Sequence, residues 1–80
     1  MTYGEKAVGL TFNPSGDKNV ERVKKLYAEI IDMLEGMRHG GSGEAPTIAS
    51  PERYRLLSVA ITEAQTAQMW AVKAITWRDE

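Results

Sequence analysis

Five alanines in the second half of the chain recur at steps of four, three, four and three residues: Ala60, Ala64, Ala67, Ala71 and Ala74. This spacing keeps a row of side chains on one face of an α-helix. Bulkier apolar residues flank the row: Ile61, Val72 and Ile75 on one side, and Met69, Trp70 and Trp77 on another. Because alanine lets a second helix approach closely while the flanking side chains need cover, the pattern predicts a helix with more than one packing neighbour.

The length of the chain limits how that cover can be supplied. A chain of 80 residues forms at most one small domain. The apolar area that it buries barely offsets chain entropy of roughly 1.5 kcal/mol per ordered residue, so such chains usually rely on disulfides, a metal or oligomerisation. The sequence has no cysteine and a single histidine, His39, so neither disulfides nor a structural metal site is expected. We therefore expect a homo-oligomer.

Charge and hydropathy narrow the class of protein further. The net charge of −1 argues against binding to polymeric nucleic acid, which favours basic domains. No charged start followed by an apolar run marks a signal peptide. The longest apolar stretches span only a few residues, which is too short to cross a membrane. These properties predict a soluble intracellular protein with no membrane partner.

The first half of the chain predicts a short arm followed by a long helix. Residues 1–16 are mixed in character and end in a turn sequence rich in asparagine, proline and glycine. Asp17 is then placed to cap a helix of residues 17–38. Its apolar positions form a single stripe at helical spacing: Val20, Val23, Tyr27, Ile30, Ile31, Leu34 and Met37. The stripe predicts a helix that packs along one face.

The second half predicts a link and a longer helix. Residues 39–50 are rich in glycine and are expected to form a flexible link that lets the chain reverse. Ser50 and Pro51 then supply a hydroxyl cap and a proline at the first position of a helix of residues 51–78. The fold class is therefore all-α, with residues 1–80 forming one antiparallel two-helix hairpin domain behind a short N-terminal arm.

The start of the first predicted helix carries the best candidate site for an anion. Four cations gather there, the first three of them on one face: Lys18, Arg22, Lys25 and the adjacent Lys24. A helix N-terminus adds unpaired N–H groups and a partial positive charge. The ring of Phe12, just before the turn, is available to stack on a base. The alternative is a solvated basic face balanced by Glu21, with Phe12 packed in the core.

The start of the second predicted helix offers another cluster of donors. Arg53 and Arg55 flank Tyr54, and arginine suits phosphate through its planar fork of donors. Arg53 and Thr62 are nine residues apart, about 13–14 Å along a helix, and point to roughly opposite sides. Several chains converging on a symmetry axis would bring both types of residue to one small ligand. The alternative is a capped helix with ordinary solvated arginines.

Catalysis has little support in the sequence. The only histidine, His39, lies in the glycine-rich stretch, and no phosphate-binding loop or dinucleotide-binding glycine motif is present. Glu29, Asp32 and Glu35 are interpreted as a solvated helix face. We therefore predict that the protein is not an enzyme and has no catalytic residue, metal or cofactor. Lys73 lies among apolar residues, where its stem can cover Trp70 or its ammonium can pair with an acid of another subunit.

Two segments resemble a known family of small phage proteins. They are residues 3–17 (YGEKAVGLTFNPSGD) and residues 60–74 (AITEAQTAQMWAVKA). Both look like the helical-hairpin domain of the anti-CBASS sponges, which sequester cyclic oligonucleotide signals of bacterial immunity and are related to the anti-Thoeris sponges. The resemblance covers nearly the whole chain except the glycine-rich link. It implies a hexamer of hairpins in the cytoplasm of an infected bacterial host, which binds signals without cleaving them.

The resemblance also implies two kinds of site. Cyclic dinucleotides of the cyclic GMP-AMP type would lie between paired protomers, where an aromatic residue stacks on a base and a lysine about fifteen positions later contacts the ligand. Leu10 stands here in the place of the aromatic residue, so Phe12 is the expected substitute. The implied dinucleotide site consists of Gly9, Leu10, Phe12, Asn13, Pro14, Ser15, Lys24 and Lys25. Cyclic trinucleotides of the tri-adenylate type would occupy pockets on threefold axes, formed by Arg53 and Thr62 with Arg55 as an alternative.

Two other functions are weighed against the sponge. A structural or protein-binding helical oligomer without a nucleotide ligand explains the alanine row and the tryptophans equally well, but leaves the basic helix start incidental. Hydrolysis of cyclic nucleotides would need a base or a metal that the sequence does not offer.

Overall fold

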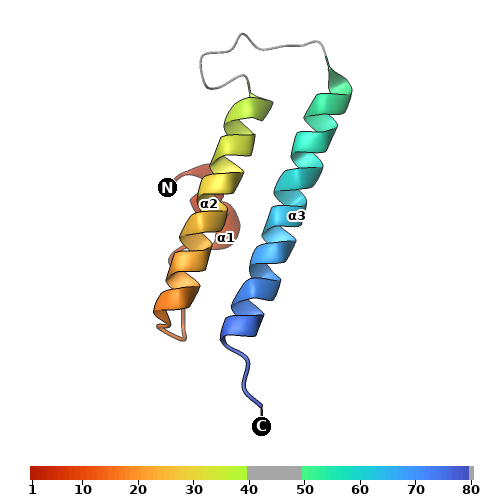
Figure 1. The fold of residues 1–80 in the computed structure, drawn as a ribbon. Helices are drawn as coiled ribbons and strands as arrows, with labels where there is room; N and C mark the ends of the chain where they lie inside the picture. The colour runs from red at the N-terminus through yellow and green to blue at the C-terminus, as the bar shows by residue number, and fades with distance from the viewer. Residues whose placement is uncertain (40–49, 80) are drawn as a thin grey trace.

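The computed structural model describes residues 1–39 and 50–79, and in this part the chain is entirely helical. It contains α1 (Tyr3–Val8), α2 (Lys18–Arg38) and α3 (Pro51–Ile75), with no strand among the described residues. The two long helices lie side by side and antiparallel, while the short α1 packs against α2 (Figure 1). The predicted all-α class is confirmed for this part of the chain, and the arrangement is consistent with a helical hairpin.

The two long helices begin where their capping residues stand. The Asp17 side chain accepts a hydrogen bond from the backbone N–H of Asn19 at 2.7 Å, and the Ser50 hydroxyl accepts one from Arg53 N–H at 3.0 Å. Each bond satisfies one of the N–H groups that a helix start leaves without a partner. The third helix ends at Ile75, three residues before the predicted end, because Thr76 turns out of the helix and donates its hydroxyl to the Val72 carbonyl at 2.8 Å.

The predicted N-terminal arm contains a helix that the sequence analysis did not predict. Thr2 and Glu5 form a capping box around the start of α1: the Thr2 hydroxyl accepts from Glu5 N–H, and the Glu5 carboxylate accepts from Thr2 N–H. Gly9 ends the helix in the left-handed conformation, at φ 62°. Only glycine adopts this conformation without strain. A helix of six residues is too short to be stable alone, so its packing on α2 maintains it.

The core lies where the three helices meet. Its buried apolar residues are Val8 of α1, Ala28 and Ile31 of α2, and Ile61 of α3. Around them pack partly buried apolar residues: Ala7, Leu10, Tyr27, Leu34 and Ala64. The predicted stripe of the first helix therefore faces the core for the most part. Ile30 is the exception, since it is exposed to solvent on the outer side of α2.

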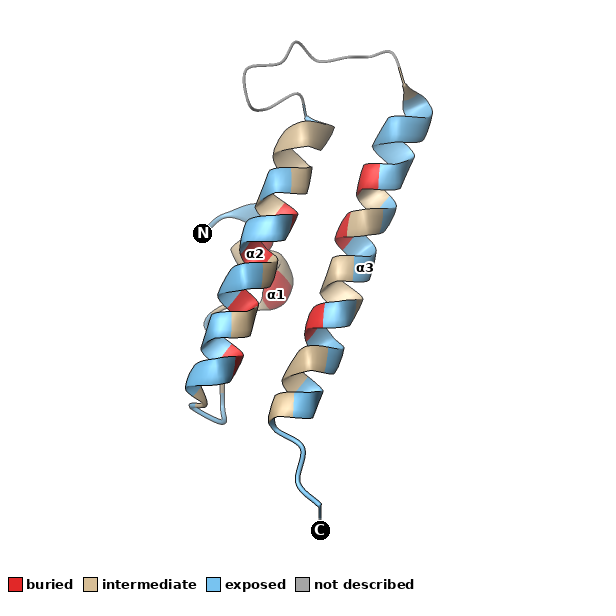
Figure 2. Cartoon of the chain, viewed as in Figure 1, coloured by how far each residue is buried: buried red, intermediate tan, exposed pale blue. Residues whose placement is uncertain are grey.

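The alanine row runs beside the contact between α2 and α3 rather than through it. The positions of α3 buried in the hairpin are Leu57, Ile61 and Gln68. Of the alanines, Ala64 contacts the core, while Ala67 and Ala74 remain exposed. Large apolar side chains also remain exposed on both long helices: Leu26, Ile30 and Met33 on α2, and Leu56, Val59, Met69 and Trp70 on α3. Exposed and half-buried positions therefore occupy most of the outer surface of the hairpin (Figure 2).

Some predictions fall outside what the structure describes. The expected flexible link, residues 39–50, lies almost wholly in residues 40–49, which are outside the described residues. That residues 1–80 form one domain, and that the chain forms an oligomer, stay predictions. None of the helices in the described part of the chain has the length and apolar character needed to span a membrane.

Candidate functional site

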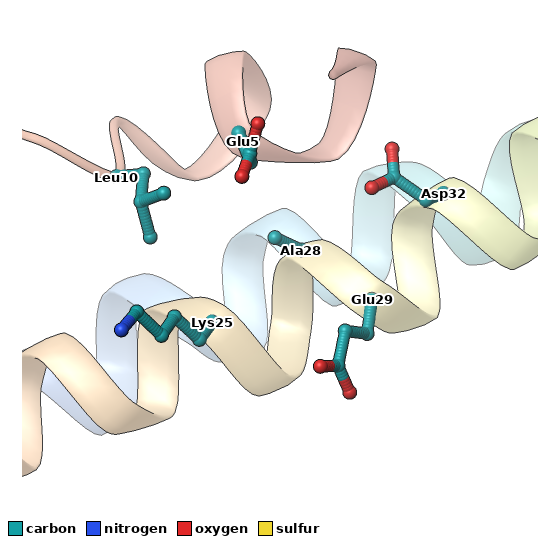
Figure 3. Close-up of a pocket in the computed structure, with 6 residues that line it drawn as sticks. All are labelled: Glu5, Leu10, Lys25, Ala28, Glu29 and Asp32. Carbon is teal, nitrogen blue, oxygen red and sulfur yellow. The ribbon is translucent and has the colours of Figure 1, made fainter. Parts of the chain in front are cut away.

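A groove between α1 and α2 is lined by residues of the N-terminal segment and by residues of α2. It has a volume of about 190 Å³. Six residues line it: Glu5, Leu10, Lys25, Ala28, Glu29 and Asp32 (Figure 3). The structure thus places Leu10 and Lys25, the pair singled out by the resemblance, on the same groove.

The close approach of α1 to α2 defines this groove. The backbone N–H of Gly4 donates to the Asp32 carboxylate at 2.7 Å. A Cβ atom at position 4 would overlap the carbonyl oxygen of Ala28, so only glycine lets the two helices come this close. The sequence analysis interpreted Asp32 as part of a solvated face; it is instead half-buried and ties the two helices together.

The groove has opposite charges at its two ends. Figure 3 shows Lys25 toward one end and Asp32 toward the other. The Lys25 ammonium is exposed and pairs with Glu21 on the same helix at 3.0 Å. Such an exposed pair is weak and readily exchanged for another anion. The exposed ammonium of Lys25 has the charge to attract an anion, and the carboxylates of Glu29 and Asp32 have oxygens that can accept N–H groups.

The connection between α1 and α2, residues 9–17, presents an exposed aromatic ring. The Phe12 side chain is 72% exposed, which excludes the alternative in which it packs in the core. Its backbone is fixed by a turn in which Phe12 N–H donates to the Gly9 carbonyl at 2.9 Å. The Lys24 ammonium donates to the carbonyl oxygens of Gly9, at 2.9 Å, and of Phe12, and lies 5.6 Å from the centre of the Phe12 ring. Lys24 is buried, and desolvation lowers its pKa below the ordinary lysine value.

The polar residues of the connection bond mainly to one another. The Ser15 hydroxyl donates to the Asn13 side-chain oxygen at 2.7 Å and accepts from Asp17 N–H at 3.1 Å. The Asn13 amide donates to the Asp17 carbonyl at 3.0 Å. Pro14 between them is exposed. These bonds shape the turn that leads into α2, so Asn13 and Ser15 fix the path of the chain next to Phe12.

The four cations at the start of α2 do not form one cluster. Lys18, Arg22 and Lys25 line a shallow depression of about 380 Å³ on the outside of the helix, together with two glutamates, Glu21 and Glu29. Lys24 points to the other side, toward the connection. The predicted anion site is thus divided into two parts. Three of its cations lie on an outer face of mixed charge, which agrees with the alternative of a basic face balanced by Glu21. The fourth, Lys24, is buried, which the spacing alone did not predict.

The candidate trinucleotide residues lie apart on α3. Arg53 and Thr62 are both exposed, and their nine-residue separation on an unbroken helix corresponds to about 13–14 Å. Arg55 forms an exposed ion pair with Glu52. A single chain therefore does not bring Arg53 and Thr62 to one small ligand, in agreement with the geometric argument from the sequence.

Arg38 was missed by the sequence analysis, although it links all three helices. Its guanidinium lies 5.7 Å from the ring centre of Tyr3 in α1 and 5.6 Å from that of Tyr54 in α3. It also pairs with Glu35 and donates to the Ser58 hydroxyl at 3.1 Å. No sequence signal distinguishes Arg38 from an ordinary basic residue in the last turn of a helix, whereas the capping box of α1 was a signal available in the sequence.

Two further features bear on chemistry. The Lys73 ammonium lies 5.4 Å from the centre of the Trp70 ring, so it is the charged group that faces the tryptophan, whereas the sequence analysis expected the stem to cover it. Within residues 1–39 and 50–79, no group of three or more acidic or histidine side chains is arranged to hold a metal ion.

The helical fold agrees with a family whose model covers most of the chain. Residues 5–76 match the Acb2/Tad1 hairpin domain, so the chain belongs to this family of anti-CBASS and anti-Thoeris sponges. The family's role is to bind cyclic nucleotides as a sponge rather than to act on them as a catalyst. Searches among curated proteins and among solved structures each gave no match to the chain.

Proposed function

We propose that this protein is a non-catalytic sponge that sequesters cyclic di- and trinucleotide immune signals and so antagonises CBASS signalling in the cytoplasm of an infected bacterial host. The proposal is carried by the groove of a chain of this family, which has an exposed ammonium at one end. An exposed aromatic ring, that of Phe12, lies on the connection two residues after Leu10 of the groove. Phosphate and base are the two parts of a nucleotide, and these two groups suit them.

The proposed dinucleotide site uses the groove and the connection beside it. Lys25 would exchange Glu21 for a ligand phosphate, and Phe12 would stack on a base. The carboxylates on the groove oppose a second phosphate, because like charges repel at short range. One groove therefore suits one phosphate and one base, and a cyclic dinucleotide would be completed by a second protomer. This supports a ligand shared between paired chains.

The proposed trinucleotide site needs more than one chain. Arg53 and Thr62 are exposed and too far apart to contact one small ligand from a single helix. Symmetry-related copies would bring an arginine from each chain to each phosphate of a cyclic trinucleotide. Arg55 is the alternative to Arg53, provided that it leaves its exposed pair with Glu52.

Self-association, to a hexamer in this proposal, would also cover the apolar outer surface. Leu26, Ile30 and Met33 on α2 and Leu56 and Trp70 on α3 are all exposed in the single chain. Apolar side chains at such density on two neighbouring helices are typical of interfaces. The exposed members of the alanine row leave room for a further helix to approach closely.

Native mass spectrometry of the purified protein, alone and with a panel of cyclic di- and trinucleotides, tests the proposal. A hexamer that takes up three dinucleotides or two trinucleotides is the expected result. The ligands should be recovered intact after denaturation, because a sponge does not cleave them. An assembly that binds none of the panel at micromolar concentration would contradict the proposal.

Variants at the two sites separate the ligand classes. Lys25→Ala is expected to weaken cyclic dinucleotides alone, and Arg53→Ala cyclic trinucleotides alone. Lys6→Ala is a matched control, because Lys6 is an exposed lysine of α1 that does not line the groove. Equal losses for both ligand classes in all three variants would indicate a non-specific charge effect.

The second candidate is a structural or protein-binding helical oligomer. It is favoured by the exposed apolar side chains, which would equally suit a protein partner. A partner recovered by pull-down, together with no response to the nucleotide panel, would support this function instead.

A further inference from the structure

Lys24 differs from the other lysines of the described chain in being buried. It is 5% exposed, yet its ammonium takes part in no ion pair among the described residues. Its hydrogen bonds go to two backbone carbonyls, of Gly9 and of Phe12. A buried charge is tolerated only when hydrogen bonds replace the lost water. Lys24 therefore has a specific task at the connection, not on the solvated face.

That task concerns Phe12. The same ammonium contacts both the backbone carbonyl of Phe12 and the face of its ring, with 5.6 Å between the nitrogen and the ring centre. The ring is nevertheless 72% exposed. A cation on one face of an aromatic ring is attractive and holds the ring in place while the rest of it stays available. Phe12 is thus both exposed and held by contacts of its backbone and its ring.

The neighbouring lysine is arranged in the opposite way. The Lys25 side chain is 58% exposed and pairs with Glu21 on the solvent side of α2. Consecutive residues of a helix point in different directions, so these two lysines cannot perform the same role at one place. The ammonium of Lys24 is committed to carbonyl oxygens, whereas that of Lys25 can exchange its partner for a ligand.

We infer that Lys24 is a positioning residue, which holds residues 9–12 so that the Phe12 ring is in place to stack on a ligand base, and that it is not itself a phosphate contact. This inference rests on the proposed function. A ring already held in its binding position avoids the entropy loss of ordering it when the ligand binds. Removing the ammonium should therefore weaken dinucleotide binding although no ligand contact is lost.

Phe12 is the only phenylalanine of the chain, which allows a direct test without ligand. Protein labelled with 4-fluorophenylalanine gives a single fluorine resonance, from the Phe12 ring. Lys24→Met, of similar length but uncharged, is expected to move this resonance toward the value of the unfolded chain and to narrow it. Lys25→Met, the matched control, should leave it unchanged. An identical spectrum for Lys24→Met and the wild type would overturn the inference.

The binding experiment tests the second half of the inference. Lys24→Met is expected to weaken cyclic dinucleotides about tenfold with trinucleotide binding and the circular dichroism spectrum unchanged. Lys24→Arg, which keeps a cation and donors, should restore part of the affinity. Equal weakening of both ligand classes would mean a general structural role and would overturn the inference. If no cyclic dinucleotide binds even the wild type, the proposed dinucleotide site fails, while the fluorine spectrum still decides whether Lys24 positions the ring.

A measurement on the wild type covers the case in which Lys24→Met does not fold. With ¹⁵N-labelled lysine, a buried ammonium bonded to carbonyls exchanges its protons slowly and gives an observable signal, whereas exposed ammonium groups exchange fast. One protected signal, absent from Lys24→Arg, supports the inference. No protected signal would overturn it.

Discussion

The two ends of α1 are both held by cations from α2, but the two cations are held very differently. At the start of α1, the Arg38 guanidinium lies between the rings of Tyr3 and Tyr54 and pairs with Glu35. At the end of α1, the Lys24 ammonium is surrounded by carbonyl oxygens and has no carboxylate partner in the described chain. The planar guanidinium suits stacking between rings, and the compact ammonium suits a cluster of carbonyls.

The difference is reflected in the electrostatics of the two groups. Burial disfavours the charge of Arg38, but its contacts with Tyr3 and Glu35 outweigh burial and raise its pKa above the ordinary value. Burial without a counterion lowers the pKa of Lys24. Arg38 thus stabilises the packing of the three helices. Lys24 orders the connection, but burying its charge costs free energy. The cation without a counterion, Lys24, is therefore the one that contacts Phe12 of the proposed dinucleotide site.

The largest effect is expected at the Arg38 end. Arg38→Ala removes a stacked and paired cation that connects all three helices, and should lower the free energy of unfolding by about 3 kcal/mol. Arg55→Ala is the matched control, because Arg55 also pairs with a glutamate three residues earlier but is exposed; no measurable change is expected. Urea unfolding at one fixed protomer concentration makes the comparison. Similar losses for both variants would mean that stacking between the tyrosines contributes nothing.

A second variant tests whether the close approach of α1 to α2, between the two cations, is needed to keep α1 in place. Gly4→Ala places a methyl group against the backbone of Ala28 and should displace α1, with a loss of about 2 kcal/mol. Gly36→Ala is the control: no atom lies within 4 Å of the added Cβ, and alanine in a helix should stabilise by about 0.5–1 kcal/mol. Thermal unfolding and amide exchange of residues 3–8 measure the effect. Unchanged protection of α1 in Gly4→Ala would show that the close approach is not required.

The contribution of Lys24 to stability should depend on pH. Because its pKa is lower in the folded chain than the 10.5 of an ordinary lysine, the unfolded state binds more protons between those two values. The free energy of unfolding of the wild type should therefore rise relative to Lys24→Met as the pH increases through this window. Denaturant unfolding of both proteins between pH 7 and about 10.5 measures the difference. A constant difference over the whole range would contradict the lowered pKa.

The smallest effect on stability is expected for Phe12 itself. Because its side chain is 72% exposed, Phe12→Ala should change the free energy of unfolding by less than about 0.5 kcal/mol. Its effect on cyclic dinucleotide binding should nevertheless be about fivefold or more, because stacking on a base contributes about 1–3 kcal/mol. Calorimetric titration and thermal unfolding of the same sample compare the two quantities. A loss of stability as large as that of Arg38→Ala would mean that Phe12 is a structural residue.

The sequence predicted the long helices better than the site. Asp17, Ser50 and Pro51 mark helix starts through side chains that act within a few residues, and the structure places caps at these positions. The short α1 was missed although Thr2 and Glu5 carry its signal, because six residues show no apolar period long enough to recognise. For the site, the resemblance grouped Leu10 with Lys25, and the structure shows that both line one groove. The three acidic residues of this groove, Glu5, Glu29 and Asp32, were not predicted to belong to it.

What the sequence determined by itself is the local structure: helical caps, helical spacing, and a length and composition that leave apolar surface uncovered in a single chain. What only the tertiary structure decided is which of two adjacent lysines is buried and which is exposed. A helix turns every residue to a new direction, so the environment of Lys24 depends on where α1 and its connection pack, and neither is encoded near position 24. The same holds for Arg38, whose partners lie in all three helices and become neighbours only when these helices are assembled.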